Sequence, residues 1–159
     1  MPDAWPAPAL TVSLHEDWER LPVTKAQWNT VVARSGTNTI FQTFEWNDAW
    51  LAVYRTRWRP MTLIAHRGDE LVAIAPLAVD RSVRGPPRVV FQGDNNADYQ
   101  DFIGAPDNDT IRAFLDKLKS RVPGAVIELS NIPATSATNQ TIASAARAAG
   151  FWPLRRPDK

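Results

Sequence analysis

The sequence predicts an α/β fold with a mixed, mostly antiparallel sheet flanked by helices. Two apolar segments, 61–66 and 70–79, flank Arg67-Gly68-Asp69, a pattern typical of an antiparallel hairpin. Helical and strand-like patterns then alternate toward the C-terminus, which also allows parallel pairing. At 159 residues the chain has the size of one domain. We expect a proline-rich extended tail over residues 1–9 and a single domain over residues 10–159.

The first half of that domain predicts one strand and two helices. Leu10–His15 alternates with period two, as a half-buried strand does. Thr24 and Gln27 have the spacing of a capping box and begin a helix that we expect to end near Gly36. A second helix is predicted from Thr43. Its apolar residues recur at helical spacing, so we expect them to form one buried face: Trp46, Ala49, Trp50, Val53 and Tyr54.

The second half predicts strands that alternate with helices. Pro76 lies inside the second hairpin strand and cannot donate to a ladder, so we expect an edge position or a bulge there. The remaining expected elements are a strand at Val89–Gln92, an amphipathic helix at Asp107–Arg121, a strand at 125–130, a helix at 139–149 and a possible last strand from Phe151.

The stretch Val89–Gly104 concentrates the groups that are able to hold a ligand. Asp94-Asn95-Asn96-Ala97 favours a tight bend, because Asp and Asn bond to their own backbone and tolerate left-handed geometry. If Tyr99 begins a strand, Tyr99 and Asp101 share one face and Asp98 points to the other. From spacing alone a solvent-exposed connection is favoured over a ligand site, since Asp and Asn are common in turns.

Composition and charge weigh against several classes of protein. The net charge of +1 provides no overall field to attract nucleic acid or an acidic membrane. The sequence has no Cys, which removes disulfides and thiolate chemistry and suits a reducing cytoplasm. No apolar run is long enough to span a bilayer, and the N-terminus lacks the features of a secretory signal. We therefore expect a cytoplasmic protein with no membrane span and no nucleic-acid partner.

Metal binding is not expected. His15 and His66 fall in predicted strands without neighbouring carboxylate ligands. Asp94-x-Asn96-x-Asp98 imitates the start of a calcium loop, but Tyr99 stands where the sharp turn requires glycine.

One basic stretch offers an alternative partner. Trp58 between Arg57 and Arg59 has the composition of a surface that stacks on single-stranded nucleic acid. Basic residues at a helix C-terminus also complement the helix dipole, and this second interpretation is favoured.

Three short motifs, in order and at matching intervals, carry a resemblance to a known family. They are Phe41-Gln-Thr-Phe-Glu45-Trp46 with Trp50 one turn later, Leu71-Val-Ala-Ile-Ala-Pro-Leu77, and Asp98-Tyr99-Gln-Asp101. Across Trp28–Asn131 the chain resembles the N-terminal half of the acetyltransferases of the cellulose-biosynthesis (CelD/BcsL) type. These are relatives of the GNAT superfamily and of the Fem-type peptidyltransferases.

The resemblance implies a GNAT-like fold and transfer of an acyl group from acetyl-CoA or another acyl-CoA. The acceptor would be an amine or hydroxyl on a small molecule or glycan precursor, in polysaccharide or cell-envelope synthesis. It also implies that Asp98, Tyr99 and Asp101 line the acceptor pocket, with Glu45 and Trp46 at its border. Which residue is catalytic stays open.

The sequence departs from GNAT proteins at the coenzyme site. It lacks the [Q/R]-x-x-G-x-[G/A] turn that holds the coenzyme pyrophosphate. We therefore expect acyl-CoA to bind a second, C-terminal GNAT lobe of the full-length protein and not this chain, which would be inactive alone. The alternative is a non-catalytic binding or scaffold module that keeps a GNAT-like shape.

Overall fold

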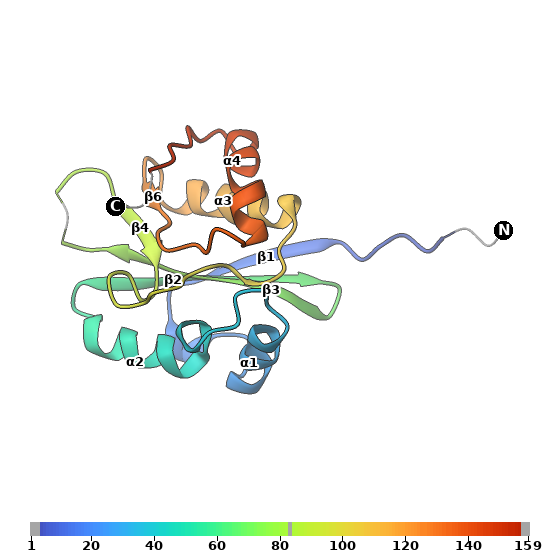
Figure 1. Cartoon of the computed structure of the whole chain (residues 1–159), viewed down its shortest axis with the longest axis horizontal. Helices are drawn as coiled ribbons and strands as arrows, with labels where there is room; N and C mark the ends of the chain where they lie inside the picture. The colour runs from blue at the N-terminus through green and yellow to red at the C-terminus, as the bar shows by residue number, and fades with distance from the viewer. Residues whose placement is uncertain (1–3, 83, 157–159) are drawn as a thin grey trace.

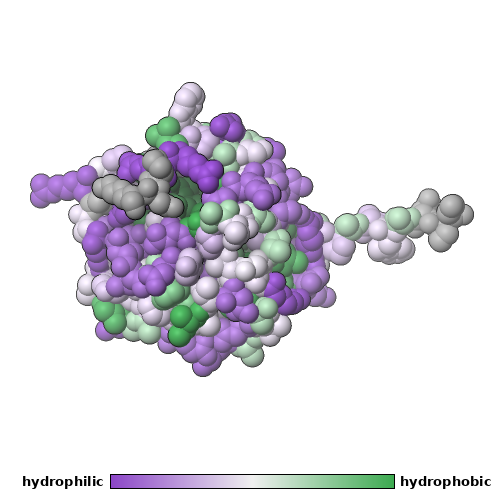
Figure 2. All heavy atoms as spheres, in the orientation of Figure 1, coloured by the Kyte–Doolittle hydropathy of each residue, from purple (hydrophilic) through white to green (hydrophobic). Residues whose placement is uncertain are grey.

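The structure is a computed structural model that describes residues 4–82 and 84–156. One sheet lies between two layers of helices, with α1 and α2 on one face and α3 and α4 on the other (Figure 1). This arrangement confirms a mixed α/β fold with a sheet flanked by helices. Residues 4–9 run out from the body without helix or strand (Figures 1 and 2).

The bounds of the elements are as follows. The strands are β1 (Leu10–His15), β2 (Trp58–Arg67), β3 (Glu70–Asp80), β4 (Arg88–Phe91), β5 (Ile103–Gly104) and β6 (Val126–Glu128). The helices are α1 (Lys25–Ala33), α2 (Phe44–Tyr54), α3 (Asn108–Arg121) and α4 (Ala137–Ala148), with short 3-10 turns at Trp18–Arg20 and Ile40–Gln42.

The sheet follows the order β1-β2-β3-β4-β6, and β5 also pairs with β3. Strands β1 to β4 pair antiparallel with their neighbours, and β6 pairs parallel to β4. The predicted hairpin is confirmed, because β2 and β3 pair along nearly their whole length around Gly68. The chain crosses from β4 to β6 by way of β5 and α3, as a parallel connection requires.

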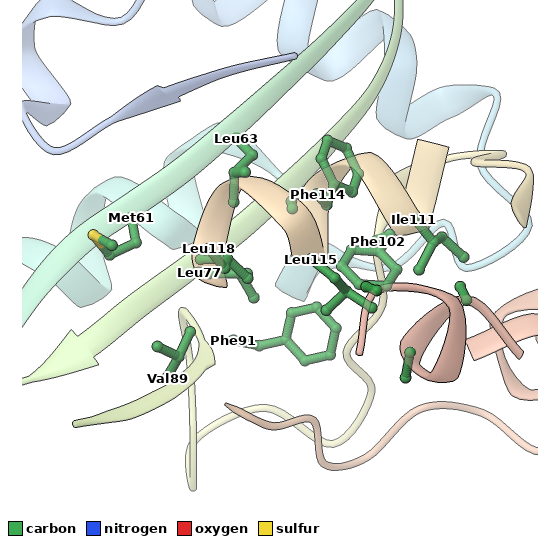
Figure 3. Packing of buried hydrophobic residues seen from close by; sticks show 14 of the residues in the cluster. Met61, Leu63, Leu77, Val89, Phe91, Phe102, Ile111, Phe114, Leu115 and Leu118 are labelled. Carbon is green, nitrogen blue, oxygen red and sulfur yellow. The ribbon is translucent and has the colours of Figure 1, made fainter. Parts of the chain in front are cut away.

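The strand period of two divides the core between the two faces of the sheet. Leu63 and Leu77 face the layer of α3 and α4, while Ile64 and Ile74 face α1. Figure 3 shows the first of these clusters around α3. There Phe102 lies between two other aromatic rings, with centroids 5.5 Å from Phe91 and 5.7 Å from Phe114.

Helix starts agree with local signals in the sequence. Thr24 accepts from the backbone N–H of Gln27, and the Gln27 side chain accepts from the backbone N–H of Thr24, so the predicted capping box is confirmed. The amphipathic helix predicted at Asp107–Arg121 is α3, with Asp107 as its N-cap.

The predicted position of Pro76 was wrong. Pro76 lies in the central strand β3, opposite Thr62 of β2, and the register shift of that pair lies at Ala65 and His66 instead. The carbonyl of Pro76 accepts from the backbone N–H of Gln92, between the β4 and β5 pairings with β3. A proline fits this central strand because its missing N–H faces a gap in the ladder.

The predicted buried face of α2 was also wrong in part. Trp50 is buried, but Val53 is 70% exposed and Ala49 is exposed. The buried residues of the helix are Asn47, Trp50 and Leu51. Asn47 is accommodated because its amide donates to the carbonyl of Thr43 at 2.8 Å.

The C-terminal elements differ from the expected bounds. The strand expected at 125–130 is limited to β6, and α4 begins two residues before the expected residue 139. Residues 151–156, where a last strand was expected, form neither helix nor strand.

The basic stretch after α2 is packed against the body of the protein. Trp58 is 4% exposed, and its ring lies 5.1 Å from the guanidinium of Arg57. Arg57 binds Asp80 at 2.8 Å and Arg59 binds Glu16 at 3.2 Å. A buried indole presents no face for a base, so the structure contradicts stacking of nucleic acid on Trp58.

The Asp80 carboxylate provides a test of this packing. Burial raises its pKa, but hydrogen bonds from Arg57 and Ser82 outweigh burial and hold the pKa at about 2. A carboxyl whose folded pKa is depressed contributes stability above its unfolded pKa and loses that contribution as pH falls toward its folded pKa.

We predict that the wild type loses more stability than Asp80→Asn as the pH falls from about 4 to about 2. The extra loss in the free energy of unfolding should be about 1 kcal/mol, a value reduced because the partner Arg57 is exposed to solvent. Urea denaturation across this pH range measures the difference. Parallel curves for the two proteins would show that the Arg57–Asp80 pair contributes nothing.

Candidate functional site

A cleft of about 530 Å³ opens where three loops meet. Its walls come from residues 36–39 after α1, residues 99–106 around β5, and residues 133–138 at the start of α4. This volume lies within the range of small-molecule sites. It is the candidate functional site.

The wall around β5 is held rigidly by the sheet. Ile103 and Gly104 pair with Ile74 and Ala73 in the middle of β3. Gly104 has φ of +93°, and a Cβ added there would lie 2.4 Å from the carbonyl oxygen of Val72, so only glycine fits. Its backbone N–H donates to the Ser35 hydroxyl at 2.6 Å, which ties this wall to the end of α1.

Asp101 joins all three walls. Its Oδ2 accepts from the hydroxyls of Thr37, at 2.8 Å, and of Ser136. Its Oδ1 accepts from the hydroxyl of Thr138, at 2.6 Å, and from the backbone N–H of Phe102, at 2.9 Å. Four donors converge on two oxygens, an arrangement that suits an ionised carboxylate because this group only accepts hydrogen bonds.

The start of α4 supports the charge of Asp101. Ser136 is the N-cap of the helix, and its hydroxyl accepts from the backbone N–H of Thr138 at 3.1 Å. The carboxylate therefore lies at the positive end of the helix dipole. No ion pair found within residues 4–82 and 84–156 includes Asp101. The charge of Asp101 is thus stabilised by hydroxyls, one backbone N–H and the helix N-terminus, and not by a cationic side chain.

Tyr99 and Asp101 are the two predicted site residues that the structure brings together. Both line the cleft, and Tyr99 is 52% exposed, so it is accessible to a ligand. The predicted strand from Tyr99 was wrong, because only Ile103 and Gly104 pair with β3. Gln100, Asp101 and Phe102 are buried in succession, without the alternation of a strand.

Asp98 does not line the cleft. It is exposed, and it follows the turn at Gln92–Asn96, where the predicted tight bend is confirmed by Asn95 with φ of +64°. A carboxylate pair formed by Asp98 and Asp101 is therefore absent from this site.

Glu45 and Trp46 also lie outside the cleft lining. Glu45 is exposed on α2 and binds Lys25 at 2.8 Å and Asn29 at 2.9 Å. These hydrogen bonds lower the pKa of Glu45 to about 2. The Trp46 ring packs edge-on against Phe41, with 4.9 Å between ring centroids. Both side chains make structural contacts, although the indole nitrogen of Trp46 is buried without a hydrogen-bond partner in the described part of the chain.

Asp94 is a buried carboxylate beside the turn that follows β4. Burial raises its pKa, while Arg88 at 3.5 Å opposes the rise. Asn95 donates to it at 3.0 Å and Ser130 at 3.4 Å. Since Arg88 also binds Glu128 of β6 at 2.7 Å, this group links the ends of the two parallel strands.

Sequence reasoning missed the hydroxyls of the site. Thr37, Ser136 and Thr138 lie 64, 35 and 37 residues from Asp101, so no local motif connects them. One available signal was Ser136, because serine is a favoured N-cap and marks the true start of α4. Thr39 also lines the cleft, and its hydroxyl oxygen is buried without a hydrogen-bond partner in the described part of the chain.

Comparisons with family models, with curated proteins and with solved structures find no match for this chain. Within the described residues, no helix is long and apolar enough to cross a membrane. The same residues contain no group of three or more His, Cys, Asp or Glu placed to hold a metal ion.

The Asp101 network predicts a large effect on stability. Asp101→Ala leaves three hydroxyls and one buried N–H without their acceptor, and we expect it to lower the free energy of unfolding by about 3 kcal/mol. Asp98→Ala, three residues away and exposed, is the matched control and should change it by less than about 0.5 kcal/mol. Urea denaturation measures both. Equal effects of the two substitutions would contradict the network.

Proposed function

We propose that this chain is the acceptor-binding half of a GNAT-type acyltransferase, which transfers an acyl group from an acyl-CoA to an amine or hydroxyl. The observation that carries the proposal is the cleft that joins Tyr99 and Asp101, two of the residues matched in the family resemblance. The order of elements and the parallel β4–β6 pair beside an otherwise antiparallel sheet are compatible with a GNAT-like fold.

The residues after β4 support a donor site elsewhere. In the proposed correspondence with GNAT proteins, the turn Gln92-Gly93-Asp94 after β4 takes the place of the loop that holds the coenzyme pyrophosphate. The Asp94 carboxylate is buried there, and an acid in that position repels a phosphate. We therefore assign acyl-CoA to a second lobe of the full-length protein and the acceptor to this one.

In the proposed reaction the acceptor nitrogen or oxygen attacks the thioester carbonyl. A C–N or C–O bond forms, the C–S bond breaks, the acceptor loses a proton and the coenzyme thiolate gains one. Asp101 is unsuited to take the proton, because each of its two oxygens already accepts two hydrogen bonds and has no lone pair left for the acceptor. Tyr99 lines the cleft, is half-exposed and carries a hydroxyl, so it is our candidate to position the acceptor or protonate the thiolate.

A non-catalytic binding module is the second candidate function. Asp101 is the only carboxylate among the described residues that line the cleft, and all of its hydrogen bonds are already made within the protein. The cleft therefore offers no free general base, which favours a binding module. The two candidates differ in one observable: a binding module shows no acyl transfer in any form of the protein.

The test is a thiol-release assay on the protein expressed from the whole reading frame, with acetyl-CoA and a panel of amines and alcohols. We expect Tyr99→Phe to lower kcat/KM by about a hundredfold with an unchanged melting temperature. Tyr54→Phe is the matched control, because Tyr54 packs on Trp50 of α2, away from the cleft, and should leave the rate unaltered.

Two results would contradict the proposal. One is full activity of Tyr99→Phe. The other is tight binding of acetyl-CoA to residues 1–159 alone, measured by calorimetry, because that places the donor site in this chain.

A further inference from the structure

We propose that Asp101 sets the ligand preference of the cleft by holding hydroxyl protons away from it, so that the cleft selects a ligand that donates hydrogen bonds, with a primary ammonium as the preferred group. The inference rests on the proposed function, for which it chooses the amine over other acceptors. It assigns Asp101 as a positioning residue, since its oxygens act on the ligand through Thr37 and Ser136.

The argument begins with the direction of the hydroxyl protons. A hydroxyl has one proton to donate and two lone pairs to accept. Thr37 and Ser136 both line the cleft, and both donate that proton to Oδ2 of Asp101. What remains for the cleft is therefore lone pairs: two on Thr37 and one on Ser136, whose other lone pair accepts from the backbone N–H of Thr138. Such oxygens bind N–H and O–H groups and repel carboxylate or phosphate oxygens.

The charge of the cleft acts in the same direction. Among the described residues that line it, Asp101 is the only one with a formal charge, and none is Lys, Arg or His. The N-terminus of α4 offsets part of this charge, by about half an elementary charge at most. The remainder is negative, and it strengthens hydrogen bonds from a cation.

The backbone makes this preference reversible by a single substitution. In Asp101→Asn, the N–H of Phe102 is a fixed donor next to the Oδ1 position, so the amide oxygen must take that position. The amide NH₂ then takes the Oδ2 position and faces Thr37 and Ser136. Both hydroxyls must accept from it, and their protons are released toward the cleft.

The experiment uses three probes that share a hexose ring: glucosamine, glucose and glucuronate. At about pH 6 the first carries an ammonium and the last a carboxylate. Their dissociation constants are measured from the amide NMR shifts of Thr37, Ser136 and Thr138, which restrict the readout to the cleft. Asp116→Asn is the control, because it removes the same charge from an exposed position on α3.

We expect glucosamine to bind the wild type about tenfold more tightly than glucuronate, with glucose between them. Asp101→Asn should abolish or invert this order, and Asp116→Asn should keep it. If Asp101→Asn does not fold, Thr37→Val provides the test: it removes one acceptor and should weaken glucosamine several-fold without weakening glucuronate.

The inference is overturned if glucuronate binds the wild type as tightly as glucosamine, if none of the probes shifts these amides, if the order survives in folded Asp101→Asn, or if Thr37→Val leaves the ratio of the glucosamine and glucuronate dissociation constants unchanged. None of these measurements involves acyl-CoA. If glucosamine binds more tightly than glucuronate but no form of the protein transfers an acyl group, the proposed function is refuted and the cleft preference stands. If the protein transfers an acyl group but glucuronate binds as tightly as glucosamine, only the preference is refuted.

Discussion

The buried carboxylate of Asp101 is the constraint on which the candidate site depends. An ionised acid removed from water is costly unless donors surround it, and here three hydroxyls and a backbone N–H do so. The backbone carbonyl of Asp101 accepts from the side-chain amide of Gln42 at 2.9 Å, which adds the segment before α2 to the same network. Segments far apart in the sequence therefore meet at one residue, and the walls of the cleft are fixed relative to one another.

The sheet explains why this carboxylate is held in place. Asp101 lies two residues before β5, and β5 pairs with the centre of the longest strand, β3. Phe102 anchors the same segment between Phe91 and Phe114 in the core. A site built beside such elements keeps its geometry better than one carried by a free loop. Tyr99 lies just outside this fixed part and keeps an exposed side chain.

The sequence allowed the prediction of those features whose signals are local. The capping box of Thr24 and Gln27, the hairpin around Gly68 and the amphipathic helix from Asp107 each depend on residues a few positions apart. Tertiary context decided the rest. From the sequence, Pro76 is expected at a sheet edge, because proline cannot donate to a ladder. It fits the central strand β3 only because it faces the gap between the β4 and β5 pairings, which the sequence does not reveal.

The α2 helix and the Asp101 site failed to be predicted in full for the same reason. The apolar residues of α2 lie around much of its circumference, so the sequence does not single out one buried face. The packing of the helix against the sheet selects that face, and Asn47 lies on it because its amide bonds to the carbonyl of Thr43. Tyr99 and Asp101 were found through a resemblance, but their hydroxyl partners lie 35 or more residues from Asp101 and have no pattern of their own.

Neutron diffraction from a deuterated crystal of the protein is the most direct test of this account, because it locates the hydroxyl deuterons. The account predicts deuterons from Thr37, Ser136 and Thr138 that all point at an unprotonated Asp101. A deuteron bound to the Asp101 carboxyl, or hydroxyl deuterons of Thr37 and Ser136 that point into the cleft, would contradict it.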